Sequence, residues 1–123
     1  MIWHFSGNKP VYQQIMDILR YAVIRGEYGP GDRIPSVRDM AAMARVNPNT
    51  MQHAVSELEH EGMLTSHGTV GRFITEDKEI LGTMKRKAQQ TLVQEFALRF
   101  REMGLSIEQA VKLLYQIEKG DVD

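Results

Sequence analysis

Cysteine is absent from this sequence, which excludes disulfide bonds, cysteine-ligated zinc and thiol catalysis. Long apolar runs are absent too: no stretch approaches the roughly 18 residues of a membrane span, so we expect no membrane partner. Residues 1–9 show no basic-then-apolar export signal, which favours a cytoplasmic protein. The sequence also contains no nucleophile–base motif, phosphate-binding loop or paired-carboxylate pattern. It therefore predicts neither an enzyme nor a cofactor.

Net positive charge is the other missing feature. The formal net charge is −1, with 15 basic and 16 acidic residues, whereas many DNA-binding domains are strongly basic. Residues 1–75 contain seven acidic residues and seven basic ones, which are Lys9, Arg20, Arg25, Arg33, Arg38, Arg45 and Arg72. A role with nucleic acid must therefore rest on where the charges lie. All four histidines also fall in residues 1–75, and partial protonation near phosphate would add positive charge there.

Helical periodicity and capping signals mark the first two helices. Apolar spacing predicts a helix with Pro10 as its first helical residue and a stop near Gly26. A short second helix is marked by Ser36, with Asp39 three residues later in a capping-box pattern. We expect this second helix to end at Val46.

A third helix and a hairpin follow closely. Asn47 is a favourable N-cap and Pro48 a favourable first helical residue, and Gly62 suits the end of this helix. Two short helices joined so tightly, the second with a polar outer face, predict a helix-turn-helix. Strand-like runs at 63–66 and 72–75, joined by a loop with two glycines, predict a β-hairpin. Together they predict a winged helix.

The pattern changes from Glu76 onward. Apolar residues recur every three to four positions and predict one helix of about 25 residues, which Gly104 stops. A last helix begins with Ser106 and Gln109 in a capping-box pattern and ends at Gly120. The predicted fold is mainly α with a small β-hairpin: a winged helix-turn-helix in residues 1–75, followed by a two-helix dimerisation tail in residues 76–123.

The apolar stripe of the tail is too wide for two helices of this size to bury alone. We therefore expect it to pair with a second copy, as a two-fold homodimer. The predicted dimerisation residues are Leu92, Phe96, Phe100 and Leu114. The alternative is a tail that folds back on its own winged helix.

Four motifs in order, at residues 35–41, 46–51, 58–64 and 68–74, resemble the GntR family of bacterial regulators. The opening residues 10–15 and the short tail resemble its YtrA subfamily. The resemblance implies a DNA-binding winged helix, usually a repressor, that acts as a dimer. It also exposes a departure: many members carry Arg or Ser where this chain has Pro48, and Arg near Gln52.

Candidate DNA contacts follow from the layout and the resemblance. The N-terminal residues of the second helix of a helix-turn-helix meet base edges in the major groove. There Gln52 is suited to adenine N6 and N7, and Thr50 to a phosphate or a thymine methyl group. The resemblance places Arg38, Arg33 and the hairpin tip near DNA. The predicted DNA-binding residues are Arg33, Ser36, Arg38, Asn47, Asn49, Thr50, Gln52, His53, His67, Gly68 and Thr69.

Simpler interpretations of the same residues remain open. The polar residues are also consistent with a solvated helix face, and Arg38 with a surface ion pair to Asp39 or Glu57. A metal site at His53 and His60 is disfavoured, because seven helical residues separate them by about 10.5 Å.

The predicted function is a sequence-specific regulator, usually a repressor, that binds a pseudo-palindromic operator in double-stranded DNA as a homodimer. The alternative is a winged helix for protein contacts without DNA binding, which the near-zero charge favours. The sequence specifies no small-molecule effector.

Overall fold

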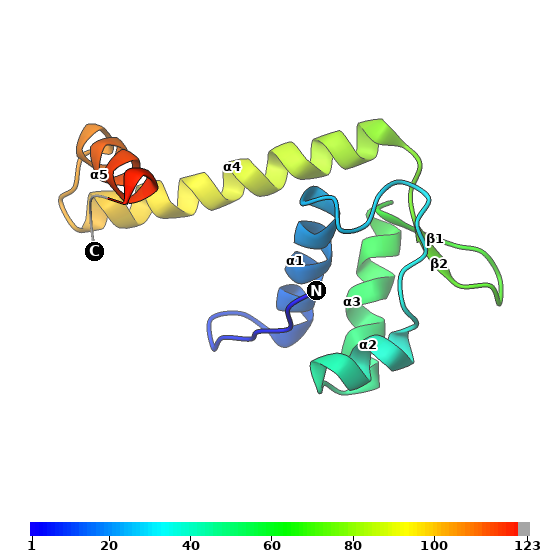
Figure 1. Ribbon diagram of the computed structural model, residues 1–123. Helices are drawn as coiled ribbons and strands as arrows, with labels where there is room; N and C mark the ends of the chain where they lie inside the picture. Colours follow the sequence, from blue (N-terminus) through cyan, green and yellow to red (C-terminus); the bar gives the residue numbers. More distant parts are fainter. Residues whose placement is uncertain (121–123) are drawn as a thin grey trace. The chain divides into compact units, whose positions relative to one another are not determined.

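The computed structural model describes residues 1–120 of the chain. The chain divides into two compact units, Met1–Lys85 and Arg86–Asp123. Figure 1 shows the order of the elements, which are α1 Val11–Ile24, α2 Val37–Ala44, α3 Pro48–His60, β1 Leu64–Ser66, β2 Arg72–Ile74, α4 Lys78–Glu102 and α5 Ile107–Lys119. The predicted fold class, mainly α with a small β-hairpin, is confirmed.

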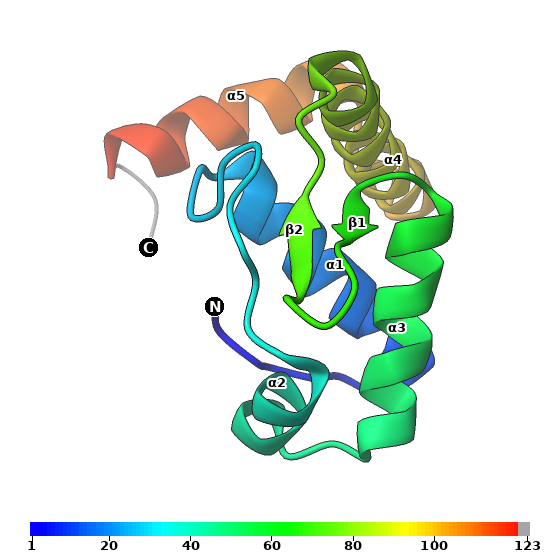
Figure 2. The ribbon, with the colours of Figure 1, turned by 90° about the vertical axis from the view of Figure 1, so that its right-hand side faces the viewer.

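The core of the first unit lies between α1 and α3, and α2 and β1 pack against α3 (Figure 2). Ile15 of α1 and Met51 and Leu58 of α3 are completely buried there. Burying one such side chain contributes about 1.5–3 kcal/mol, so the apolar faces of these amphipathic helices hold the unit together. Trp3 and Phe5 of the segment before α1 also pack against this core.

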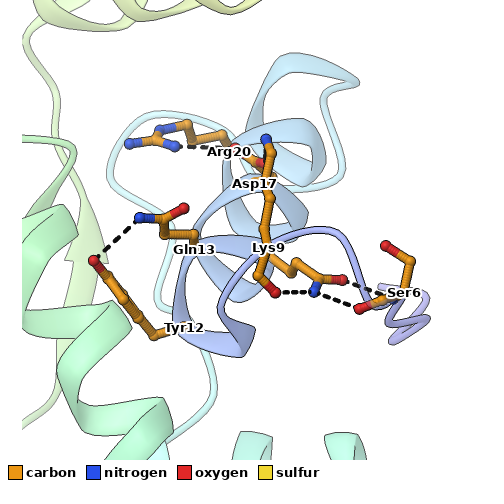
Figure 3. A network of polar contacts seen from close by, with 7 residues as sticks. Ser6, Lys9, Tyr12, Gln13, Asp17 and Arg20 are labelled. Atoms are coloured by element: carbon orange, nitrogen blue, oxygen red, sulfur yellow. Dashed lines mark hydrogen bonds and ion pairs between the residues drawn. The ribbon is translucent and has the colours of Figure 1, made fainter.

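The start of α1 differs from the prediction. Pro10 has a ψ of 143°, which is extended backbone, so it is the N-cap and the helix begins at Val11. The Pro10 carbonyl accepts hydrogen bonds from the N–H groups of Gln13 and Gln14. The Gln14 side chain bonds the backbone of Ser6 and Lys9 at 2.7–2.8 Å. These bonds, drawn in Figure 3, fasten the leading segment to the helix.

The helix-turn-helix forms as its capping signals predict. Ser36 Oγ accepts a hydrogen bond from the Asp39 N–H at 3.1 Å, which is half of the expected capping box. Asn47 Oδ1 caps α3 by accepting from the Asn49 N–H at 2.8 Å, with Pro48 as the first helical residue. The end of α2 differs from the prediction: its last helical residue is Ala44, two residues before Val46.

The hairpin pairs β1 with β2 in antiparallel register, with Leu64 opposite Ile74 and Ser66 opposite Arg72. Each strand is one residue shorter than predicted, because Met63 and Thr75 lie outside the strands, although the Thr75 N–H still bonds the Met63 carbonyl. The segment before α2 adds to the free edge of β2 through a bridge between Arg33 and Phe73.

The long helix α4 spans 25 residues, as predicted, and α5 has both hydrogen bonds of the Ser106–Gln109 capping box. The predicted boundary after Thr75 differs from the division at Lys85. The reason is that Leu81 and Met84, in the first turns of α4, pack against the core of the first unit. The assignment of DNA binding and dimerisation to the two parts of the chain stays a prediction.

Candidate nucleic-acid interface

The outer face of α3 carries the polar residues expected to read bases. Asn49, Gln52 and His53 are exposed and Thr50 is half-buried, whereas Met51 on the opposite face is buried. The Gln52 amide donates a hydrogen bond to Ser56 Oγ at 2.9 Å, one helical turn further on. This bond uses one of the two amide hydrogens and leaves the carbonyl oxygen free to accept. Gln52 therefore keeps the donor and acceptor that adenine recognition requires.

Two predicted contact residues already serve as helix caps. Ser36 Oγ accepts the Asp39 N–H, and Asn47 Oδ1 accepts the Asn49 N–H. Each side chain still holds a donor, because a hydroxyl retains its own hydrogen and an amide its NH2 group. Capping and donation to a phosphate oxygen are therefore compatible at both positions.

The ion pairs of the first unit divide its basic residues into two sets. Four are paired: Lys9 and Arg20 with Asp17 at 3.1–3.2 Å, Arg20 also with Glu61 at 2.8 Å, Arg25 with Glu27 at 3.2 Å, and Arg72 with Glu59. Arg33, Arg38 and Arg45 are exposed and make no ion pair or side-chain hydrogen bond within residues 1–120. The balanced net charge therefore includes three arginines that have no ion-pair partner within residues 1–120, although Asp32 and Asp39 adjoin two of them in sequence.

These three arginines belong to the helix-turn-helix and to the segment before α2 that lies beside the hairpin. Arg38 lies in the first turn of α2, and Arg45 caps its C-terminus. The alternative that Arg38 pairs with Asp39 or Glu57 is not found among the described residues. Sequence reasoning missed Arg45, because nothing in the sequence distinguishes it from the arginines that are paired in the fold.

The hairpin tip is ordered by its own contacts. The His67 N–H bonds the Gly71 carbonyl at 3.0 Å, and Gly68 adopts a φ of +56°. The His67 ring meets Phe73 edge-on at 4.9 Å, and its Nε2 lies 3.2 Å from Thr65 Oγ1. His67, Gly68 and Thr69 are exposed, as a wing contact requires. Val70 is also exposed at this tip (58%), although a loop valine offers no hydrogen-bond donor for DNA.

Arg33 lies directly beside the hairpin. A Cβ atom at Gly71 would stand 2.9 Å from Arg33 Nε, and the Gly71 φ of +136° independently favours glycine. On the other side of the hairpin, Arg72 pairs with Glu59 and thereby links β2 to α3. The fold thus brings Arg33 next to the wing and ties the wing to the helix expected to enter the groove.

His53 faces α1. Its ring stacks on Tyr12 with centroids 4.0 Å apart, and its Nε2 lies 3.9 Å from a Glu57 carboxylate oxygen. Tyr12 and Glu57 also line a shallow cavity of about 330 Å³ between α1 and α3. Figure 3 shows the α1 side of this region, where Lys9 and Arg20 both pair with Asp17. Arg20 also pairs with Glu61, so two carboxylates balance the two cations. The positive charges on this side are compensated within the protein.

The described residues form neither a metal-binding cluster nor a membrane-spanning helix. No group of three or more His, Asp or Glu side chains in residues 1–120 is placed to hold a metal ion. None of the helices built from those residues combines the length and apolar character needed to cross a bilayer.

A tight pair of helices, a wing and three exposed arginines outside any ion pair of residues 1–120 define a winged helix-turn-helix DNA-binding protein. The family model of the bacterial regulatory proteins, gntR family, matches residues 11–74. The chain is 37% identical to the HTH-type transcriptional regulator YhcF of Bacillus subtilis, over 94% of this chain and 96% of that one. It is 34% identical to the HTH-type transcriptional repressor YtrA of the same organism, over 72% of this chain and 66% of that one.

A solved structure agrees with these relatives. A GntR family transcriptional regulator from Listeria monocytogenes superposes with a TM-score of 0.84 at 28% identity, covering 91% of this chain and 98% of that one. The chain belongs to the GntR family, with relatives of the YtrA type, and is a DNA-binding transcription regulator and not an enzyme. This assignment argues against a winged helix that serves protein contacts alone.

Proposed function

We propose that the protein represses transcription by binding a pseudo-palindromic operator as a homodimer in the cytoplasm. The observation that carries the proposal is the apolar surface left exposed on the second unit. Repression is supported by the similarity to the repressor YtrA. A dimer that occupies a site overlapping a promoter blocks polymerase without needing a further domain.

The exposed apolar surface is large for so small a unit. Ala110 is the only buried residue in 86–120, whereas Leu92, Phe96 and Leu114 are 44%, 45% and 56% exposed. The rings of Phe96 and Phe100 lie 6.3 Å apart on the same helix face. Burying apolar surface contributes about 25 cal/mol per Å², and monomers rarely leave such a patch open. We propose Leu92, Phe96, Phe100 and Leu114 as the dimer contacts.

Two-fold symmetry then sets the form of the operator. A closed dimer presents two copies of α3 to one duplex, so the half-sites are inverted repeats about one DNA turn, roughly 10 bp, apart. In each half-site, Asn49, Thr50 and Gln52 read base edges from the first turns of α3. His53 lies beyond them, and its open ring face leaves it available at the edge of the interface.

Contacts with the DNA backbone fix the position of the protein on each half-site. Arg38 and Ser36 at the start of α2, and Asn47 at the start of α3, are placed for phosphate oxygens. Arg33 acts beside the wing, whose tip residues His67, Gly68 and Thr69 follow the minor groove. Such contacts set affinity, whereas the α3 contacts set sequence preference.

Selection from a random-sequence duplex library, followed by footprinting, tests the proposal. We expect an inverted repeat with two protected half-sites, and two protein chains per duplex in sedimentation. A single asymmetric site bound by one chain overturns the dimer mechanism. Placing the selected site across a promoter should lower transcript yield in vitro, and a raised yield would contradict repression.

A further inference from the structure

Arg45 is the only residue other than glycine within residues 1–120 whose backbone has a positive φ. Its φ of 56° and ψ of 46° lie in the left-handed helical region, where an L side chain is crowded and glycine or asparagine is the usual choice. The turn requires this conformation, since the Val46 N–H then bonds the Ala41 carbonyl at 3.1 Å and closes α2. The sequence therefore keeps an arginine where glycine or asparagine would be less strained.

The surroundings of Arg45 offer this side chain no partner. It is exposed and forms no ion pair with any residue in the described part of the chain. It stands two residues before Asn47, the N-cap of α3, and α3 itself contains no lysine or arginine. In a helix-turn-helix the first helix crosses the DNA backbone and the second enters the groove. The turn that joins them therefore lies beside phosphates.

We propose that Arg45 binds a DNA phosphate and supplies at the turn the positive charge that α3 lacks. Its planar guanidinium is suited to two parallel hydrogen bonds with phosphate oxygens. The inference rests on DNA binding by the winged helix, and it adds a contact that sequence analysis did not include. A competing explanation is local: a cation near the C-terminus of α2 is favoured by the partial negative charge of the helix end.

Arg45→Gly removes the charge and also relieves the left-handed strain. Only the phosphate explanation predicts that the salt dependence of DNA binding changes as well. The full-length variant is titrated with a fluorescein-labelled duplex of mixed sequence at several KCl concentrations, and its melting temperature is recorded without DNA. We expect affinity to fall roughly ten- to a hundredfold per bound chain, because the lost contact is a hydrogen-bonded pair between charged groups. The negative slope of log K against log [KCl] should become shallower by about one per bound chain. The melting temperature should equal or exceed that of the wild type.

Arg25→Gly is the matched control. Arg25 is also an exposed arginine that caps a helix C-terminus, but it pairs with Glu27 and has an ordinary φ of −72°. This variant should keep the wild-type salt slope. Arg45→Lys should recover most of the slope, and Arg45→Asn, which tolerates the left-handed region without charge, should behave like Arg45→Gly.

The outcomes distinguish loss of the Arg45 contact from loss of DNA binding itself. A wild-type slope in Arg45→Gly, with a lowered melting temperature, overturns the phosphate contact and supports the local helix-end explanation. Absence of salt-dependent DNA binding by the wild-type protein overturns DNA binding itself, and the Arg45 contact with it.

Discussion

Tyr12 of α1 stacks on His53 of α3, with ring centroids 4.0 Å apart and planes inclined by 19°. The contact joins residues 41 positions apart and braces the helix expected to enter the groove against the first helix. The Tyr12 hydroxyl also accepts a hydrogen bond from the Gln13 amide at 3.2 Å. The stack covers one face of the His53 ring and so limits how that residue meets DNA.

Loss of the Tyr12 ring should destabilise the first unit. Tyr12→Ala removes the stack and apolar burial, and we expect the free energy of unfolding to fall by about 1–3 kcal/mol in urea denaturation. Tyr12→Phe keeps the ring and loses only the hydroxyl, so it should remain within about 0.5 kcal/mol of wild type. Equal losses in both variants would assign the effect to the hydroxyl instead.

Removing Arg38 should weaken DNA binding without unfolding the protein. Arg38 makes no ion pair within residues 1–120, so removing it leaves no acidic side chain without its partner. We expect Arg38→Ala to cost about 1–3 kcal/mol of binding free energy, measured by fluorescence titration at fixed salt on the selected operator. Arg25→Ala, at a paired arginine on the C-terminus of α1, serves as control. Unchanged affinity of Arg38→Ala would remove this residue from the interface.

Removing the Gln52 amide should reduce discrimination more than affinity. Because base contacts set preference and phosphate contacts set overall affinity, Gln52→Ala should bind mixed-sequence DNA almost as wild type but lose about 1–3 kcal/mol on the operator. Ser56→Ala, which removes only the acceptor of the Gln52 hydrogen bond, is the control and should retain preference. Equal losses on both DNAs count against base reading.

Charges placed in the proposed dimer interface should separate the chains. Phe96→Asp with Phe100→Asp buries unpaired carboxylates if the stripe is covered by a second copy. We expect a monomer in analytical ultracentrifugation and much weaker operator binding, because linked half-site contacts gain from high effective concentration. Leu98→Asp is the control, since Leu98 is 55% exposed and lies two residues from Phe96, on the opposite side of α4.

If the double mutant remains dimeric, the dimer interface lies elsewhere on the chain. A monomer that still binds the full operator as tightly as wild type would contradict the dimer mechanism as a whole.

The pair Glu59–Arg72 should couple the wing to α3. Both side chains are less than one-third exposed, and we expect a double-mutant cycle with Glu59→Gln and Arg72→Gln to give about 0.5–1 kcal/mol of coupling. Hydrogen exchange of the β1–β2 amides should accelerate in either single variant while the α1 amides stay protected. Strictly additive effects would show that the wing is held by its backbone bonds alone.

Local signals in the sequence determined most of the element pattern. Asn47 before Pro48, Ser106 with Gln109, and the glycine-containing loop 67–71 act through neighbours a few residues away, and each appears in the structure as predicted. Because these signals act over only a few residues, they also left some helix boundaries wrongly predicted. Pro10 is compatible with the N-cap and with the first helical position, and the contacts of its carbonyl decided between them.

Which residues are free to meet DNA was decided only by the tertiary structure. The sequence shows seven basic and seven acidic residues in 1–75. Asp17 lies one helical turn before Arg20, but nothing local separates Arg72 from Arg38. Folding brings Arg20 to Glu61 and Arg72 to Glu59, and it leaves Arg33, Arg38 and Arg45 without an ion-pair partner within residues 1–120. Coulomb attraction depends on distance in space, so composition alone could not reveal where the positive charge remains.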